Sequence, residues 1–390
     1  MRKLIYLATF ASMTHVAAQN MEAVMASVER NNLTLKVLRE ETDARKFAGR
    51  AGVALPGPEI GFGYLWGSPA GTGSRTDLSL TQRLDVPTII GMKGRLADQH
   101  GELAETGYRA GRAAILAEAQ RLCIELVHSN LQNRELRARV EHAETVAAHY
   151  RQRLDAGDAN RLEFNRAQLS LSTLRSELRR AESNRNALSA SLAQLNGGEA
   201  TAITDTLYAP LAPPEDFELW FESVAPQSPA MVGAAQEAEA GRRELSLSKA
   251  SSWPSLTAGY MSERTMGQRY GGLTVGLSIP LWENSGRIRQ ARAGLRAAES
   301  RRDNVRVELH SRLKILYTRA LELREALEQA RAALNEADSR PLLQKSLDAG
   351  AISLAEYLAS LTLQYEAVDD LLATERDYIL ALADMRAAGF

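Results

Sequence analysis

Leu-Thr-Gln-Arg-Leu-Asp-Val-Pro at residues 80–87 returns 193 positions later as Leu-Thr-Val-Gly-Leu-Ser-Ile-Pro at 273–280. Each copy is followed by Leu-Asp-Ala-Gly, at 154–157 and at 347–350, with the glycine 70 positions after the proline. Because both landmarks have the same offset, the chain contains one unit written twice with no net insertion. The repeat predicts two similar halves of one body rather than two or three unrelated domains.

The composition indicates long helices and gives no support for a nucleic-acid partner. Ala, Leu, Arg, Glu and Ser dominate residues 95–197 and 285–388, and aromatic residues make up only 6% of the 390 residues. Such a mixture is typical of long helices rather than of a thick globular core. The formal net charge is −1, and Arg and Glu are interspersed rather than segregated, which argues against binding to nucleic acid.

The single cysteine, Cys123, lies within a helical pattern. One cysteine excludes an internal disulfide, and its position excludes an acylated cysteine at the mature N-terminus. We expect Cys123 to be a small buried residue of a helix.

The first 18 residues have the pattern of a secretory signal peptide. Met-Arg-Lys is followed by an apolar run from Leu4 to Phe10 and by Val16-Ala17-Ala18, which predicts cleavage before Gln19. A membrane anchor is the alternative interpretation, but the run is too short to span a bilayer as a helix. No later stretch approaches the roughly 18 uncharged residues that a spanning helix requires. If the exported chain crosses a membrane, it must do so with strands.

Four segments of about ten residues alternate between apolar and polar side chains, as amphipathic strands do. Trp66 and Trp253 lie at strand ends, where an aromatic girdle is expected for strands that cross a bilayer at a tilt. The alternative is two ordinary amphipathic hairpins packed on a soluble core, although the other residues are mostly helical and offer little to cover the apolar faces. The predicted strands cover about 58–67, 75–87, 253–262 and 271–281.

The polar sides of these strands predict a water-filled lumen. Four strands cannot close into a barrel, and an open sheet edge is forbidden in lipid. Three chains would supply twelve strands, enough to leave a channel, whereas a barrel of about eight strands is already filled by side chains. We therefore expect a trimer whose lumen is lined by the polar residues of the strands: Asp77, Ser79, Thr81, Arg83, Asp85, Thr274 and Ser278.

The whole sequence predicts a mainly α fold with a small antiparallel β part, in two tandem repeats of helix, β-hairpin and long helical hairpin. Apolar residues step by three and four through both helical hairpins, which indicates helices packed side by side. Residues 198–227 are expected to link the repeats and to pack at the waist, because Leu219, Trp220 and Phe221 are too apolar for a free linker. The first repeat is expected at 19–197, with a helix at 21–50 and its helical hairpin at about 90–197, and the second at 228–390, with its helical hairpin at about 285–388.

Both helical hairpins are expected to turn at their Leu-Asp-Ala-Gly tetrapeptides, over 154–160 and 347–353. Gly157 and Gly350 supply the positive φ that ends a helix. Two pairs then match the capping box that begins a returning helix. They are Asn160 with Glu163 and Ser353 with Glu356.

The repeat, the strand ending in Gly-Leu-Ser-Ile-Pro-Leu-Trp at 276–282, and the Leu-Asp-Ala-Gly turns followed by capped helices resemble the TolC-like outer membrane efflux proteins of Gram-negative bacteria. The resemblance covers essentially the whole mature chain, although the strand loops and the waist segment are short. It implies a homotrimer with a twelve-stranded barrel in outer-membrane lipid, continued by an α-helical barrel through the periplasm. It further implies a passive duct without catalytic site or cofactor, docked on a periplasmic adaptor and an inner-membrane pump.

In this family the helical turns meet the adaptor and constrict the pore. The matching positions are Leu154, Asp155, Gly157 and Asn160 in one turn, and Leu347, Asp348, Gly350 and Ser353 in the other. By the same analogy, Asp155, Asp158 and Asp348 are candidates for a ring of gate carboxylates, with Arg151 and Arg153 as partners. The alternative is that these are solvated turn residues. The segment Asp85-Val86-Pro87-Thr88 looks most like members that serve heavy-metal pumps.

Other classes fit the sequence less well. A periplasmic coiled-coil adaptor or scaffold would need the alternating segments to form a soluble domain, and a type I protein secretion duct would differ in cargo. An enzyme would need a nucleophile and base or a metal constellation, and the sequence offers neither. His142 and His149 are seven positions apart, but without a ligand cluster they are interpreted as solvated helix residues rather than a metal site.

Overall fold

The computed structural model describes residues 21–69, 71–84, 86–265, 267–279, 284–336 and 339–388. The predicted signal peptide, Asp85 and the end of the 276–282 motif lie outside the described residues. The described residues form two compact units: unit 1 holds 21–36 with 111–224 and 309–388, and unit 2 holds 37–110 with 225–308.

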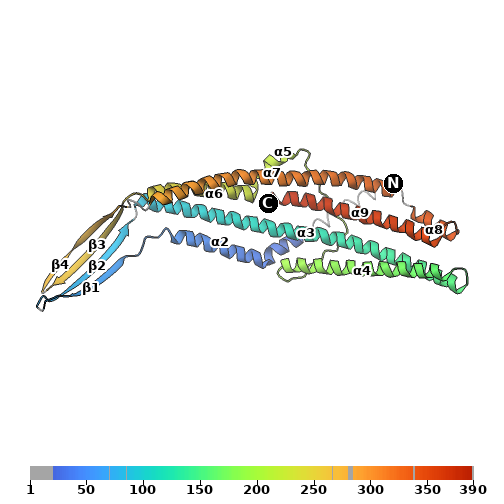
Figure 1. The fold of residues 1–390 in the computed structure, drawn as a ribbon, viewed down its shortest axis with the longest axis horizontal. Coiled ribbons are helices and arrows are strands. Elements are labelled where there is room, and N and C mark those ends of the chain that lie inside the picture. Colours follow the sequence, from blue (N-terminus) through green and yellow to red (C-terminus); the bar gives the residue numbers. More distant parts are fainter. Residues whose placement is uncertain are drawn as a thin grey trace. The chain divides into compact units, whose positions relative to one another are not determined.

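The elements of the second half follow the order of those in the first, as the repeat predicts (Figure 1). Most described residues are helical and the strands form one small antiparallel sheet, so the predicted fold class is confirmed. No helix among the described residues is both long enough and apolar enough to cross a bilayer. The elements are α2 (Leu33–Ala51), β1 (Glu59–Trp66), β2 (Ser74–Leu84), α3 (Pro87–Asp155), α4 (Arg161–Leu195), α5 (Phe217–Val224), α6 (Pro229–Ala250), β3 (Ser255–Thr265), β4 (Gln268–Ser278), α7 (Asn284–Glu336), α8 (Arg340–Asp348) and α9 (Leu354–Ala387).

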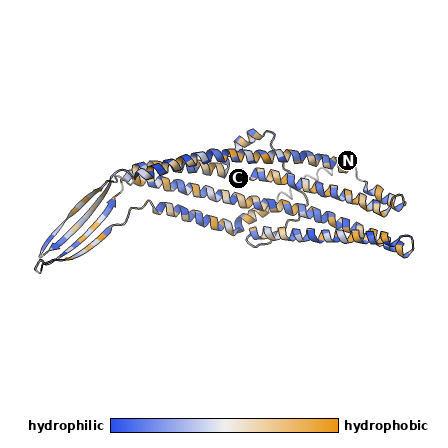
Figure 2. Ribbon diagram, in the orientation of Figure 1, coloured by the Kyte–Doolittle hydropathy of each residue, from blue (hydrophilic) through white to orange (hydrophobic). Residues whose placement is uncertain are grey.

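The sheet of unit 2 has the strand order β1-β2-β3-β4, and every neighbouring pair is antiparallel. Register places Ile60, Leu80, Tyr260 and Leu273 in one row across all four strands. Paired residues share a face of a sheet, so this row lies on a single apolar face. Figure 2 shows hydrophobic and hydrophilic residues alternating along the strands.

Unit 1 is held together by helix faces that follow the predicted three-four stepping. The cluster nearest the turns buries Val140, Ala147 and Tyr150 of α3 against Leu171 of α4 and Tyr357 of α9. The stepping brings such residues onto one side of each helix, where burying an aliphatic or aromatic side chain stabilises the packed state by roughly 1.5–3 kcal/mol.

Several helix and strand boundaries differ from the sequence prediction, including those of β3 and β4, which are each shifted by two to three residues. The strand expected to reach residue 87 ends at Leu84, and Pro87 instead begins α3, where its fixed φ suits the first helical position. The helix expected over 21–50 is interrupted at Asn32, whose Oδ1 accepts the Leu35 amide at 2.9 Å and so begins α2. In the second hairpin α7 ends at Glu336 and α8 begins at Arg340, because Pro341 cannot continue a helix.

The linker is only partly as predicted. Helix α5 forms within it, with Phe217 and Phe221 buried and their rings stacked at 6.1 Å, and Trp220 packs on the α9 core. Leu219, expected to pack, is 74% exposed because it lies on the outer side of this short amphipathic helix.

Candidate functional site

Both helical turns of unit 1 close with the same backbone hydrogen bonds. At the first, the Gly157 amide donates to the Leu154 carbonyl and the Asp158 amide to the Arg153 carbonyl, at 3.1 and 2.8 Å. At the second, the amides of Gly350 and Ala351 make the corresponding bonds at 3.0 and 2.8 Å. Gly157 has φ +84° and Gly350 φ +69°, the left-handed conformation that ends a helix in this motif.

The returning helices begin with complete capping boxes. The Glu163 amide donates to Asn160 Oδ1 at 2.9 Å, and the Asn160 amide donates back to the Glu163 carboxylate at 3.0 Å. Ser353 and Glu356 repeat the arrangement at 3.2 and 2.8 Å. Bonding to Ser353 also lowers the pKa of the Glu356 carboxyl. Each turn is therefore held by hydrogen bonds between residues that are close together in the sequence.

The charged side chains of the turns bond mostly within their own turn. Arg151 Nε lies 3.2 Å from the Asp155 carboxylate, one helical turn away, and both side chains are 61% exposed. Arg153 donates to the backbone carbonyl of Asp158 at 3.1 Å. Asp348 accepts from Gln344 Nε2 at 2.9 Å. Asp155, Asp158 and Asp348 thus remain at the exposed surface, and the predicted gate role stays a prediction.

Asp348 is also the end of a hydrogen-bonded chain that reaches into the core. Gln344 Oε1 accepts from the Tyr357 hydroxyl at 2.7 Å, and the same hydroxyl lies 2.7 Å from His142 Nε2. Burial, together with the neighbouring Tyr365 and Asp348, raises the pKa of Tyr357 to about 12, so its hydroxyl stays protonated and donates to Gln344. His142 Nε2 must then donate to Tyr357 Oη, which fixes the tautomer of a neutral ring.

His142 was expected to be solvated, and this interpretation is wrong. Its ring is half-buried, it bonds to a nearly inaccessible tyrosine, and burial lowers its pKa. His149 is exposed and packs edge-on against Tyr150 at 5.9 Å. The described residues contain no group of three or more side chains able to hold a metal ion.

An ion pair between a buried arginine and a half-exposed aspartate links the two hairpins one helical turn from His142. Arg139 of α3 makes two bonds to the Asp369 carboxylate of α9, at 2.7 and 2.9 Å, and its guanidinium lies 4.5 Å from the Tyr365 ring centre. We call Arg139, Asp369 and Tyr365 the α3–α9 clasp. The Arg139 side chain is 4% exposed, and its Nε has no partner among the described residues.

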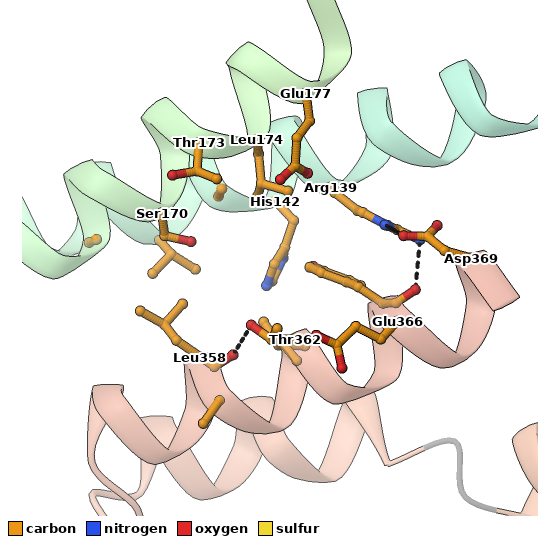
Figure 3. A pocket seen from close by; sticks show the side chains of 16 residues that line it. Arg139, His142, Ser170, Thr173, Leu174, Glu177, Leu358, Thr362, Glu366 and Asp369 are labelled. Carbon is orange, nitrogen blue, oxygen red and sulfur yellow. Dashed lines mark hydrogen bonds and ion pairs between the residues drawn. The ribbon is translucent and has the colours of Figure 1, made fainter. Parts of the chain in front are cut away.

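The clasp borders a cavity of about 450 Å³ between α3, α4 and α9. Figure 3 shows Thr173 and Glu177 of α4 on one side of this cavity and Thr362 and Glu366 of α9 on the other. The cavity is therefore lined by polar groups from three helices, and the clasp links α3 to α9 at its border.

Sequence reasoning missed the clasp and the Tyr357 chain. Asp369 is 230 positions from Arg139, so no local spacing predicts their contact. One signal was present: Arg139 stands three positions after Leu136 and four before Ala143, on the apolar stripe itself. A charged residue on such a stripe is buried only if it has a partner.

The polar residues of the sheet share one face, as the alternation predicts. Thr81, Gly259 and Thr274 form one row across β2, β3 and β4, and Arg83, Thr257 and Gly276 form the next. Asp77, Ser79 and Ser278 have the same parity and belong to this face. It carries an internal ion-pair cluster, since Arg75 lies 2.9 Å from Asp77 and 3.2 Å from Glu263.

The opposite face is apolar and exposed. Ile60 is 74% exposed, Leu273 87% and Val275 80%, and Trp66 and Trp253 are exposed near the two ends of the strands. Soluble monomers rarely leave such a continuous apolar surface uncovered.

Cys123 is fully buried as expected, and burial raises the pKa of its thiol to about 12.

Comparisons with known proteins agree with this geometry. Residues 220–388 match the family model of the outer membrane efflux proteins. No curated protein matches the sequence. The fold resembles a membrane protein from Pseudomonas aeruginosa, with TM-score 0.80 and 18% identity over 95% of this chain and 90% of that one.

Two solved outer membrane proteins have the same fold. The CmeC outer membrane channel of Campylobacter jejuni has TM-score 0.76 and 15% identity over 95% of this chain and 86% of that one. The outer membrane protein VceC of Vibrio cholerae has TM-score 0.77 and 14% identity over 95% of this chain and 96% of that one. Neither the scaffold nor the secretion-duct alternative is favoured by these matches.

Proposed function

We propose that the chain, whose residues 220–388 match the family model of the outer membrane efflux proteins, belongs to that family and works as the passive outer-membrane duct of a tripartite efflux system. In this role it is not an enzyme. It extends from the outer membrane into the periplasm, where an adaptor and an inner-membrane pump deliver the cargo. The cargo class proposed is small molecules or metal ions.

One observation carries the assignment: the sheet is two-faced and has two unpaired edges. Strands β1 and β4 each have a neighbour on one side only within the described chain. In lipid every backbone N–H and C=O must be paired, so such a sheet needs further strands. Three copies supply twelve, and a closed barrel of twelve leaves a water-filled lumen. A homotrimer is therefore the proposed assembly.

The two faces then take opposite roles. The exposed apolar rows that include Ile60 and Leu273 meet outer-membrane lipid, with Trp66 and Trp253 in the interfacial girdles. The opposite face, with Asp77, Ser79, Thr81, Arg83, Thr274 and Ser278, lines the lumen, and Asp85, which lies outside the described residues, is proposed to join it.

The helical turns are the proposed adaptor contacts and the proposed gate. The backbone hydrogen bonds at the turn glycines and the capping boxes hold each turn in one conformation. The proposed contact surface is formed by Leu154, Asp155, Gly157 and Asn160 on one turn and by Leu347, Asp348, Gly350 and Ser353 on the other. Asp155, Asp158 and Asp348 bring carboxylates to the pore entrance, with Arg151 and Arg153 as local partners. The α3–α9 clasp is proposed to hold α9 against α3.

Purification from outer membranes followed by mass determination and bilayer recording tests the proposal. We expect a detergent-solubilised particle of three chains that gives discrete channels in planar bilayers of neutral lipid. Replacing Asp155 and Asp348 by Ala should change conductance, cation selectivity or closure if the carboxylates gate the pore. A monomeric soluble particle without channel activity would refute the duct, and unaltered single-channel behaviour of the double variant would refute the gate.

A further inference from the structure

The apolar face of the sheet carries two arginines directly opposite each other. Arg264 of β3 pairs with Arg269 of β4, in the row that contains Tyr64 of β1 and Thr76 of β2. Both arginines lie four positions from the Tyr260–Leu273 pair and so have its parity. They therefore extend from the face proposed to meet lipid, and both are exposed.

Neither guanidinium has a hydrogen bond or ion pair with any described residue. The contrast with the other face is direct, because Arg75 there is neutralised by Asp77 at 2.9 Å and by Glu263 at 3.2 Å. Like charges directly opposite on paired strands repel. An unpaired arginine on a lipid-facing strand also costs free energy unless it lies near the interface. The two arginines therefore need an anion from outside the sheet to neutralise their charge.

The position of the row within the sheet indicates where that anion comes from. Arg264 and Arg269 are next to the last pair of the hairpin, Thr265 with Gln268. The helices of unit 2 join the strands at the opposite end, since α3 follows β2 and α7 follows β4. If those helices lead into the periplasm, the arginine row lies at the outer interface, beside the Tyr64–Trp66 aromatic pair with ring centres 5.6 Å apart.

We propose that Arg264 and Arg269 form a binding site for the phosphate groups of an anionic lipid in the outer leaflet. The proposal rests on the barrel orientation of the proposed function. Guanidinium groups bind phosphate oxygens through two parallel hydrogen bonds, and two of them at one row give a doubly charged cradle. A bound phosphate removes the repulsion between the arginines and anchors the hairpin at the interface.

Lipid retention by the full purified chain tests the site. The probe is diphosphoryl lipid A in neutral detergent micelles, compared with lipid A from which both phosphates have been removed, and with inorganic phosphate as a competitor. We expect Arg264→Gln with Arg269→Gln to weaken retention of diphosphoryl lipid A about thirtyfold, at about 1 kcal/mol for each charge near an anionic surface. Arg264→Lys with Arg269→Lys should keep most of the binding, since the charges remain. Inorganic phosphate at equal concentration should not displace the lipid.

Arg75→Gln is the matched control, because it removes an arginine from the other face of the same hairpin region and should leave retention unchanged. Equal retention by the wild type and the Gln double variant, an equal loss in Arg75→Gln, or displacement by inorganic phosphate would overturn the lipid site. Channel formation in bilayers of neutral lipid is recorded on the same preparations. Absence of channels from the wild type counts against the duct, whereas the retention ratio alone decides the lipid site.

Discussion

Arg139 and Asp369 join the two helical hairpins through a pair of bonds at 2.7 and 2.9 Å, although 230 positions separate them. The arginine side chain is 4% exposed and the aspartate side chain 46% exposed. A buried guanidinium without a partner costs several kcal/mol, so the carboxylate at the rim of the cavity determines where α9 can lie against α3.

Replacing Asp369 by Asn should destabilise unit 1 and loosen the contact between α9 and α3. The amide cannot neutralise the buried Arg139, and we expect a loss of about 1–3 kcal/mol in the free energy of unfolding, reduced from the fully buried case by the solvent exposure of Asp369. Urea titration in detergent measures the loss, and single-channel recording should show altered open times. Glu182→Gln is the control, because its pair with Arg137 is 66% and 42% exposed and should change stability by less than about 1 kcal/mol. Equal losses of stability in the two variants would show that the clasp does not stabilise unit 1 more than an exposed ion pair does.

Local patterns predicted the features that local chemistry builds. Strand parity follows from alternation, and the two turns follow from a glycine and a capping pair within a few residues of each other. The apolar stripe indicates that Arg139 needs a partner, but it could not predict Asp369, because that pairing depends on which side of α9 meets α3. The helix break at Asn32 also depends on a distant contact. The Asn32 Nδ2 donates to the Leu195 carbonyl at 2.7 Å, while its Oδ1 accepts the Leu35 amide at the start of α2.

Replacing glycine by alanine should lower the free energy of unfolding at the two turns and raise it inside α3. Gly157→Ala and Gly350→Ala should each destabilise the turn by about 1–2 kcal/mol, because φ is +84° and +69° and a methyl group penalises that conformation. No atom lies within 4 Å of either added methyl, so crowding does not contribute. Gly107→Ala, inside α3 and equally uncrowded, should stabilise by about 0.5–1 kcal/mol. Hydrogen exchange of the amides at each site reports the sign, and destabilisation at all three positions would contradict the conformational argument.

His142 predicts a loss of stability in weak acid. Burial lowers its pKa below the ordinary value of about 6.5, so between the two values the unfolded chain binds a proton that the folded chain does not. The free energy of unfolding should therefore fall as the pH drops below about 6.5 and level off once the pH is below the folded pKa. Urea midpoints measured from pH 7.5 to 5 should show a smaller decline in His142→Gln, whose Nε2 can still donate to Tyr357. An identical decline in both proteins would show that His142 does not contribute to it.

Leu273 and Thr274 are adjacent on β4 and test which face of the sheet meets lipid. Leu273 is 87% exposed on the apolar face, whereas Thr274 lies on the polar face in register with Gly259. Leu273→Arg should cost about 2–4 kcal/mol if the side chain enters the middle of the bilayer, while Thr274→Arg should be accommodated in a water-filled lumen and alter conductance instead. The fraction of folded chain recovered in neutral vesicles over a urea series measures the difference. Equal folding of the two variants would indicate that neither face contacts hydrocarbon, and the reverse order would place the polar face toward lipid and exclude the lumen assigned to it.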